Sequence, residues 1–397
     1  MMEMRYKLKD IFDLQMGKTP SRNNSEYWNT EDYKWISIAD LGKTGKYISE
    51  TKEYLSESAV TDSGIKVIPA NTVVMSFKLS IGKTAITAED MYSNEAIMAF
   101  HDRHVIDILP EYIYYMFKYK NWDEGSNKAV MGKTLNKATL SEVEIDIHSV
   151  EEQRKIVNVL DKMMAVLAGR EAELVLLDDL IKARFVEMFG DLASNPCGWD
   201  TFTMEECFDI TSSKRILKSE WKSQGIPFLR VRDMVQLATT GQMDNEYFVS
   251  EEFYESLSDS DGVPRKGDIL VSATSTLGKC HVVGEGERYY FKDADVLRFR
   301  AKKEINPIFF MELMKTYYVE DQISKTLGIT TVAHFTIKAA KTINMRCPAI
   351  ELQDEFADFV KQVHKSKFQK NNAIILSYNI NVFETRRRFI CKPTLII

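Results

Sequence analysis

The chain has 397 residues, of which 44% are hydrophobic and 28% are charged, and its net charge is −6. This length indicates two or three domains with sizeable cores, and no apolar run approaches the roughly 20 residues of a membrane-spanning helix. The acidic balance, with a pI of about 5.7, weighs mildly against a nucleic-acid binder, although a net charge conceals local basic patches.

The first residues, MMEMRYKLKDIFDL, contain no apolar core and no cleavage-like site, so we expect no secretory signal. The five cysteines are scattered, and no two have the spacing of a zinc knuckle. They are typical of reduced thiols in a cytoplasmic protein. We therefore predict a cytoplasmic protein without a structural metal.

In chain order, KWISIADL at residues 34–41 and NTVVMSF at residues 71–77 are typical of buried or half-buried strands. PEYIYYMFKY from Pro110 and NPIFFMELMKTYY from Asn306 predict helices with proline near the start. Strand-rich and helical segments mix without a strict βαβ rhythm, so the predicted class is α+β.

A long helix is predicted between these parts, where EEQRKIVNVLDKMMAVL begins at Glu151. Its apolar residues recur in alternating steps of four and three, the spacing of a heptad seam that faces a partner helix. The pattern ends at FVEMFGD, where Gly190 is a typical stop, so the helix would be roughly 55–60 Å long. The seam consists of Ile156, Leu160, Met163, Leu167, Leu174, Leu177, Ile181 and Met188, and only Arg170 and Arg184 interrupt it.

The chain repeats itself after about half its length. WISIADL at Trp35 reappears as FLRVRDM at Phe228, VVMSFKLSIGK as ILVSATSTLGK, and VEEQRKIV as IELQDEFA. Because the offset between the copies stays nearly constant, the chain contains a duplicated unit. Phe356, Val360 and Val363 occupy the seam positions of the second copy, so we expect the two helices to pack side by side.

This duplication predicts two similar globular domains joined by two long helices with pseudo-twofold symmetry. The predicted segments are a first domain at residues 1–148, a first spacer helix at 149–190, a second domain at 191–348, a second helix at 349–378 and an atypical tail at 379–397.

No catalytic centre stands out in the sequence. The tripeptide GKT occurs at Gly17, Gly42, Gly82 and Gly132, but none has the earlier glycine of a phosphate-binding loop. There is no GxGxxG, no HExxH and no NPPY-like methyl-transfer loop. The pair His101 and His104 lacks a third ligand nearby, so we interpret it as a surface pair and expect no metal. Two copies of one module that carries no catalytic motif suggest a protein whose function is binding.

Loops at equivalent places in the two copies carry donors suited to phosphates and base edges. Lys and Arg neutralise phosphates, whereas Asn, Ser, Thr and Arg can read base edges. The candidate DNA-binding residues are Lys18, Thr19, Ser21, Arg22, Lys78, Ser80, Lys83, Lys133 and Asn136 in the first copy, and Lys214, Arg215, Ser272, Ser275, Lys279, Thr330, Thr331 and His334 in the second.

The order of these pieces resembles the specificity subunit of type I restriction–modification systems. The resembling stretches are MGKTPSR, WISIADL, VVMSFKLSIGK, VEEQRKIVNVLDK and LIKARFVEMFGD, followed in the second copy by FLRVRDM, GDILVSATSTLGK, AHFTIKAAKTINM and IELQDEFADFV. Together they cover about residues 5–365, and their duplicated order is more specific than any single stretch.

The resemblance implies a non-catalytic subunit. Each globular part would be a target recognition domain that reads one half of a bipartite double-stranded DNA sequence, and the helices would form an antiparallel coiled coil that sets the unread spacer. The helices would also dock two modification (methyltransferase) subunits, and the complex would recruit restriction subunits. No cofactor is expected in this chain, because S-adenosylmethionine, ATP and Mg²⁺ would belong to the partner subunits. No membrane association is implied.

The end of the chain departs from this pattern. After Val363 the sequence reads HKSKFQKNNAIILSYNINVFETRRRFICKPTLII instead of ending like FVEMFGD, so lysines occupy the next seam positions. We expect incomplete pairing of the two helices there.

Two rival functions remain open at the level of the sequence. One is the DNA-reading part of a fused restriction–methyltransferase, although no segment is left over for a methyltransferase domain. The other is a duplicated scaffold or carbohydrate-binding module, which would not bind duplex DNA in a salt-sensitive way.

Overall fold

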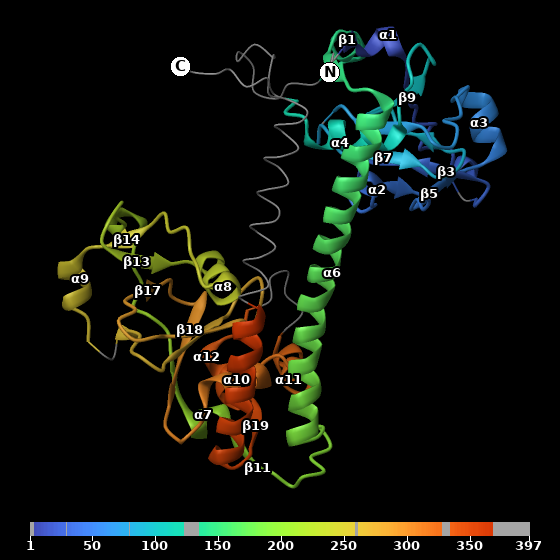
Figure 1. Ribbon diagram of the computed structural model, residues 1–397. Coiled ribbons are helices and arrows are strands. Elements are labelled where there is room, and N and C mark those ends of the chain that lie inside the picture. Colours follow the sequence, from blue (N-terminus) through green and yellow to red (C-terminus); the bar gives the residue numbers. More distant parts are fainter. Residues whose placement is uncertain are drawn as a thin grey trace. The chain divides into compact units, whose positions relative to one another are not determined.

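The computed structural model describes residues 4–28, 30–78, 80–122, 135–258, 261–327 and 334–367. These residues form two compact units, the first reaching residue 171 and the second beginning at residue 172, inside one long helix. Each unit combines a small set of sheets with short helices (Figure 1), which confirms the predicted α+β class.

The first unit contains three sheets, whose strand orders are β2-β9-β6-β7-β4, β5-β3-β8 and β1-β10. Its elements are β1 (Met4–Lys7), α1 (Leu8–Ile11), β2 (Phe12–Met16), η1 (Ser25–Tyr27), β3 (Tyr33–Ile36), α2 (Ile38–Leu41), β4 (Tyr47–Ile48), β5 (Glu53–Leu55), α3 (Glu57–Ser63), β6 (Val73–Ser76), β7 (Thr84–Thr87), β8 (Tyr92–Ser93), β9 (Ile97–Asp102), α4 (Pro110–Tyr119), α5 (Lys137–Ser141), β10 (Glu144–Ile147) and the start of α6 (Val150–Phe189).

The central strands β6 and β9 of the five-stranded sheet in the first unit are largely buried on both faces. Along β9, Met98 and Phe100 point into a core that α4 and the first turns of α6 complete. The alternate residues Ile97 and Ala99 point into a second, smaller core on the other face. This alternation follows from the two-residue period of a strand and explains why β6 and the first half of β9 are almost entirely apolar.

The second unit repeats this arrangement, with strand orders β12-β18-β15-β16, β14-β13-β17 and β11-β19. Its elements are β11 (Asp200–Thr203), α7 (Met204–Cys207), β12 (Phe208–Thr211), η2 (Lys218–Glu220), β13 (Ile226–Leu229), α8 (Val231–Thr240), β14 (Phe248–Val249), α9 (Glu251–Glu255), β15 (Ile269–Ser272), β16 (Cys280–Val282), β17 (Tyr290–Phe291), β18 (Val296–Ala301), α10 (Pro307–Leu313), α11 (Tyr317–Thr326), α12 (Ile337–Thr342) and β19 (Asn344–Cys347), followed by a helix at residues 350–367.

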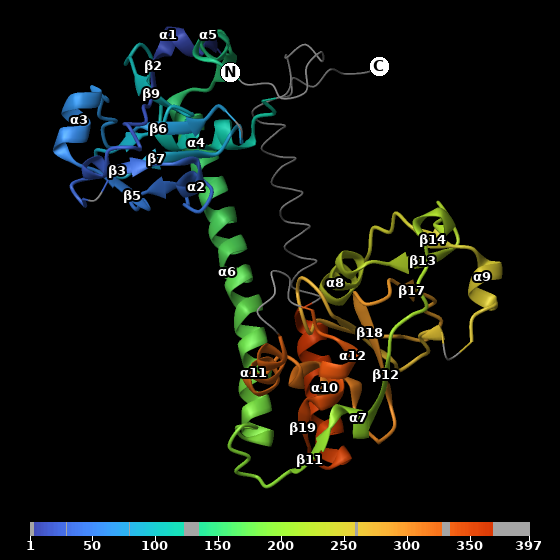
Figure 2. The ribbon, with the colours of Figure 1, turned by 180° about the vertical axis from the view of Figure 1, so that it is seen from behind.

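The internal repeat is therefore confirmed strand by strand. β3 pairs in parallel with β8 just as β13 pairs in parallel with β17, and β1-β10 has its equivalent in β11-β19. Figure 2 shows both units from behind, each with strands and short helices. One strand of the first unit has no counterpart. In the first unit β4 pairs with the outer side of β7, whereas no described strand pairs with the outer side of β16, the equivalent of β7.

A buried glutamine closes the same corner of each unit. The Gln153 side chain accepts a hydrogen bond from the Leu109 amide at 2.9 Å and donates to the carbonyls of Asp107 and His148. The Gln353 side chain accepts from the Asn306 amide at 3.0 Å and donates to the Pro348 carbonyl at 2.8 Å. Both side chains tie the start of a long helix to the loop that precedes α4 or α10.

The long helix α6 contains 40 residues, so its length is about 60 Å, as predicted. Its first seam residues, Ile156 and Leu160, are buried in the core of the first unit, and Leu167 is also buried. Leu174 is half-buried, as is Met163. The first two residues of the seam thus face the core of their own globular domain.

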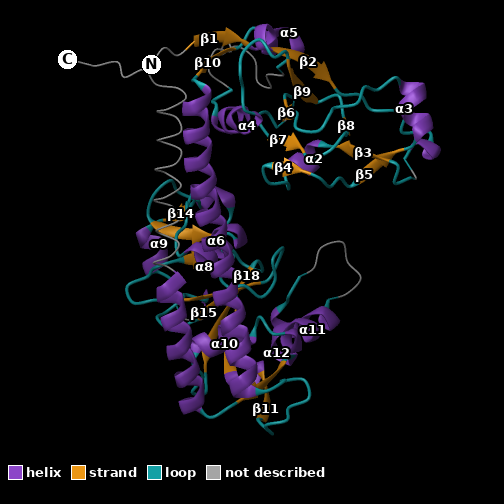
Figure 3. Cartoon of the chain, turned by 45° about the vertical axis from the view of Figure 1, so that its right-hand side comes forward, coloured by secondary structure: helices purple, strands orange, loops and turns teal. Residues whose placement is uncertain are grey.

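The second half of α6 packs antiparallel against the helix at residues 350–367, both within the second unit (Figure 3). Phe185 and Phe189 each contact Phe356 with ring centroids 5.4 Å apart. Farther along, the Lys367 ammonium lies 2.6 Å from the carboxylate of Asp178. This pairing confirms the predicted partnership of the two helices, and Ile181, Leu177 and Met188 join the same core.

The predicted loss of the seam begins at Lys367, which forms this ion pair. The rest of the predicted second helix and the tail at 379–397 lie outside the described residues. Among the described residues, Cys197, Cys207, Cys280 and Cys347 are free cysteines. Across this part of the chain, no helix is both long and apolar enough to cross a membrane.

Candidate nucleic-acid interface

In the first unit, four loops meet at one edge of the sheets. The end of β2 and the end of β6 flank the start of β9, because both strands run antiparallel to it. Backbone hydrogen bonds join these loops: Lys18 donates to Ser93 at 2.8 Å, Asn94 to Ile36 at 3.0 Å and Phe77 to Ala96 at 2.9 Å. The predicted stretches MGKTPSR and FKLSIGK are thereby brought to the same place.

The side chains at this edge form a mixed cationic and polar cluster around Glu95. Thr19 donates its hydroxyl to the Glu95 carboxylate. This hydrogen bond lowers the pKa of Glu95, and the charges of Lys78 and Arg22 lower it further. The structure thus brings three predicted residues together, around an exposed acidic residue that we did not predict.

Arg22 is fixed in orientation at this edge. Its guanidinium lies 3.7 Å from the ring centroid of Trp28 and 4.9 Å from that of Trp35. It also pairs with both carboxylate oxygens of Glu53. A planar guanidinium held in this way is suited to recognising a phosphate or a base edge. Its neighbour Ser21 is exposed and accepts a hydrogen bond from the Trp28 indole through its carbonyl.

The loop that carries Ser80 and Lys83 has the same framework in both units. Ser76 donates its hydroxyl to the Ser80 carbonyl and accepts from the Lys83 amide at 3.1 Å. Ser272 donates to the Thr276 carbonyl and accepts from the Lys279 amide at 2.9 Å. In each unit one buried serine shapes the loop from within.

This framework corrects one predicted contact. Ser272 is fully buried and its hydroxyl is used inside the loop, so we assign it to loop geometry and not to a ligand. Its loop neighbours Ser275 and Lys279 are exposed, and Ser275 has a positive φ of 61°. In the first unit Ser80 is exposed, whereas Lys83 is half-buried against Gly42.

Asn136 also has a structural role. Its side chain caps α5 by accepting a hydrogen bond from the Thr139 amide at 2.8 Å. Thr336 caps α12 in the same way, which confirms that this corner is duplicated. Lys133, Thr330 and Thr331 lie outside the described residues. His334 is half-buried and forms a β-bridge with Thr274, which places it beside the loop of Ser275.

The second unit builds the corresponding edge. The Ser213 hydroxyl donates to the Phe291 carbonyl at 2.6 Å, and the Lys214 amide donates to the hydroxyl of Tyr290 at 2.8 Å. These bonds hold the loop of Lys214 and Arg215, both exposed, against the end of β17. Burial raises the pKa of Tyr290 to about 12, so this hydroxyl stays protonated at neutral pH.

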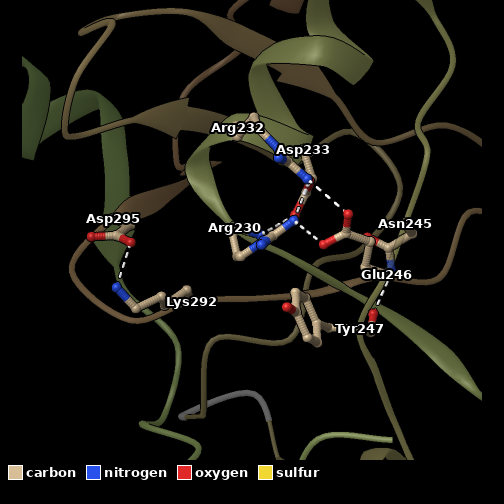
Figure 4. Close-up of polar contacts among 8 residues, drawn as sticks. All are labelled: Arg230, Arg232, Asp233, Asn245, Glu246, Tyr247, Lys292 and Asp295. Carbon is tan, nitrogen blue, oxygen red and sulfur yellow. Dashed lines mark hydrogen bonds and ion pairs between the residues drawn. The ribbon is translucent and has the colours of Figure 1, made fainter. Parts of the chain in front are cut away.

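Three cations at this edge were missed by sequence reasoning (Figure 4). Arg230 and Arg232 follow directly after β13, and Lys292 follows β17, where its ammonium lies 2.6 Å from the Asp295 carboxylate. The Lys292 amide donates to the Leu229 carbonyl at 2.8 Å, so the two strand ends are adjacent. The signal was present in FLRVRDM, which carries two arginines where WISIADL has Ser37 and Ala39.

The two histidines of the predicted surface pair have different surroundings. The His101 ring lies 3.1 Å from the Gln15 side-chain oxygen, whereas His104 is 86% exposed and faces Asp102 at 3.3 Å. No group of three or more His, Cys, Asp or Glu side chains in the described part of the chain could hold a metal ion.

Two copies of one α+β module, each presenting a donor-rich edge, define the chain as a duplicated two-domain protein. The comparisons specify it further: the model of the type I restriction modification DNA specificity domain matches residues 3–174 and again residues 196–376. The chain belongs to this family.

Relatives of the chain carry the same description. The chain is 28% identical over 254 residues to the type I restriction enzyme MjaIX specificity subunit of Methanocaldococcus jannaschii, a stretch that covers 58% of this chain and 57% of that protein. It is 30% identical over 152 residues to the EcoR124I/EcoR124II specificity subunit of Escherichia coli, covering 37% of each. The aligned stretches thus span little more than half the length of these relatives, or less.

Solved structures share the fold over nearly the whole chain. A chain from a structure that describes complex assembly and conformational transition of the type I R-M system aligns with a TM-score of 0.64 at 15% identity, covering 97% of both chains. The S subunit of a type I restriction-modification system from M. genitalium aligns with a TM-score of 0.53 at 16% identity, covering 98% of this chain and 96% of that one.

Proposed function

We propose that this chain is the DNA-recognition subunit of a type I restriction–modification complex. Each unit would read one half of a bipartite double-stranded DNA target with its donor-rich edge. The observation that carries the proposal is the occurrence of this edge twice, on equivalent loops, in a chain whose two halves both match the specificity-domain family. Exposed arginines and lysines would contact phosphates, and oriented arginines would read base edges.

The chain would supply recognition and leave the chemistry to its partners. Two modification subunits would dock on the long helices and carry S-adenosylmethionine, and restriction subunits would supply ATP-driven, Mg²⁺-dependent cleavage. In support, α6 carries exposed aliphatic side chains, such as Val166 and Leu176, that are suited to a partner surface. The helix α6 would also set the unread spacer between the half-sites.

A domain exchange tests the proposal. The chain is coexpressed with its modification subunit, and the methylated motif is determined by sequencing the methylated DNA. Replacing residues 1–148 or residues 196–348 with the domain of another family member should change one half of the motif and leave the other half intact. A replacement that altered both halves together would contradict separate readout by the two units.

Two binding measurements separate the rival functions. Affinity of the purified chain for duplex DNA should fall by about tenfold or more between about 50 and about 200 mM salt, because bound phosphates release counterions. A scaffold or carbohydrate-binding module would show no such DNA binding. The isolated chain should not bind S-adenosylmethionine, whereas a fused restriction–methyltransferase fragment that includes the catalytic domain would bind it.

A further inference from the structure

The two units differ where β3 and β13 end. In the first unit β3 leads into α2, which has only 4 residues, and the position after its first residue is Ala39. In the second unit β13 leads into α8, which has 10 residues and carries Arg232 at the equivalent position. The second unit therefore presents a longer helix with a cation at its start, beside Lys292 and the loop of Lys214.

Arg230 forms the fixed base of this feature. Its guanidinium donates to both carboxylate oxygens of the buried Asp233, at 2.9 and 3.1 Å, and to Glu246 at 3.2 Å. It also lies 4.5 Å from the ring centroid of Tyr247. Because its side chain is only 23% exposed, Arg230 holds the two carboxylates in place and has little surface left for a ligand.

Arg232 is the outer member of the same network (Figure 4). Its side chain is 64% exposed, and its guanidinium lies 3.5 Å from Asp233 and 3.5 Å from Glu246. Both ion pairs of Arg232 are long and its side chain is largely in solvent, so the guanidinium is oriented toward this surface but can exchange its partners for a ligand. It borders an open depression of about 760 Å³ that Gln236, Met243, Asp244, Asn245 and Glu246 also line.

The charges around Arg232 indicate which part of DNA it meets. A phosphate placed on this guanidinium would lie beside the carboxylates of Asp233, Glu246 and Asp244, which would repel it. The edge of a guanine offers two acceptors, O6 and N7, without a negative charge, and arginine is its commonest partner. Gln236 lies one helical turn farther along the same face, where its amide donates to Asp244 at 3.3 Å.

We propose that Arg232 determines a guanine in the half-site read by the second unit, with Arg230 as a positioning residue that acts through Asp233 and Glu246. This inference rests on the proposed function, because it assigns one base contact within the target that the complex methylates. In the first unit Ala39 offers no equivalent contact, so the two half-sites would be read with different elements.

The test begins with the methylated motif of the wild-type complex. Arg232→Ala should lower discrimination at one G·C position in one half of that motif by about 10- to 100-fold, and leave the other half unchanged. Arg232→Lys, which keeps the charge and loses the paired donors, should relax the same position while overall methylation persists. Arg230→Ala should relax that position as well, because Asp233 and Glu246 lose their orientation.

Arg288→Ala is the matched control. Arg288 also pairs with two carboxylates, Glu251 and Glu255, and lies 4.9 Å from the ring centroid of Tyr254, but it precedes β17 at the opposite end of that strand from Lys292. This variant should keep the wild-type motif.

An unchanged motif in both Arg232 variants would overturn the inference. An equal loss of methylation at all sequences would also overturn it, because that result would indicate a phosphate contact. If the wild-type complex methylated no bipartite motif, the proposed function itself would fail.

Discussion

Gln153 and Gln353 show how single side chains hold each unit together. Removing either one leaves a partly buried backbone amide and at least one carbonyl without a partner, so Gln153→Ala and Gln353→Ala should each lower the free energy of unfolding by about 2–4 kcal/mol. Urea unfolding followed by circular dichroism measures the loss. The exposed Gln242 provides the control, since Gln242→Ala should change stability by less than about 0.5 kcal/mol. Equal losses in all three variants would show that the buried bonds are unimportant.

His101 should make the protein less stable in mild acid. Burial lowers the pKa of His101 below its usual 6.5, and Asp13 opposes this shift only partly. Between the lowered pKa and 6.5 the unfolded chain binds more protons than the folded chain. The stability that neutral His101 contributes is therefore complete above about pH 6.5 and is lost as the pH falls below that value.

Urea unfolding at pH 7.5 and at pH 5.5 tests this expectation. The loss of stability at the lower pH should be smaller in His101→Asn than in the wild type, and should persist in His104→Asn, whose side chain is exposed. An undiminished loss in His101→Asn would assign the acid sensitivity to other groups.

Residue patterns could be predicted from the sequence where they recur in both copies, and not elsewhere. Ser76, Gln153 and Asp40 recur in the second copy as Ser272, Gln353 and Asp233. Aligning these positions located the loops at the donor-rich edge of each unit. Arg230 and Arg232 occur in one copy only. Their orientation depends on Glu246 and Tyr247, which belong to a later segment of the chain, so the local sequence does not reveal it. Ser272 was misassigned because a sequence does not reveal which hydroxyls face inward.

At the scale of elements, the C-terminal end of α6 is held by aromatic packing. Phe185 is 4% exposed and its ring contacts those of Phe189, Phe309 and Phe356. Phe185→Ala should destabilise the second unit by about 3–5 kcal/mol, because it removes this packing and leaves a cavity. Val186, the next residue, is 58% exposed, so Val186→Ala is the matched control and should have little effect. Calorimetry compares the two variants with the wild type.

The heptad spacing correctly predicted one long helix, but it could not assign a partner to each part of the seam. Heptad and globular-helix patterns are alike over a few turns, so Ile156 and Leu160 gave the same signal as Ile181. In the structure the first two complete the core of their own unit, whereas Ile181 lies in the core that contains the second helix. Tertiary context, absent from a local pattern, decides between these roles.

At the scale of the whole molecule, the two units have separate cores and should unfold in separable steps. Phe117 belongs to the core of the first unit and Phe310 to that of the second. Phe117→Ala should lower the temperature of one calorimetric transition and Phe310→Ala that of the other, each by several degrees, since each substitution should cost about 3–5 kcal/mol. If either substitution shifted both transitions equally, the chain would unfold as a single cooperative unit.

The frame of the edge is built by inward-facing groups that bind backbone atoms: Ser76 and Ser272 within their loops, and Asp40 and Asp233 at the starts of α2 and α8. Under the proposed function, mutation can therefore change what a half reads with little effect on folding. Because the units meet inside one uninterrupted helix, recombination within the α6 coding region would exchange a whole half at once. A lineage carrying such genes could acquire new DNA specificities by shuffling as well as by gradual substitution.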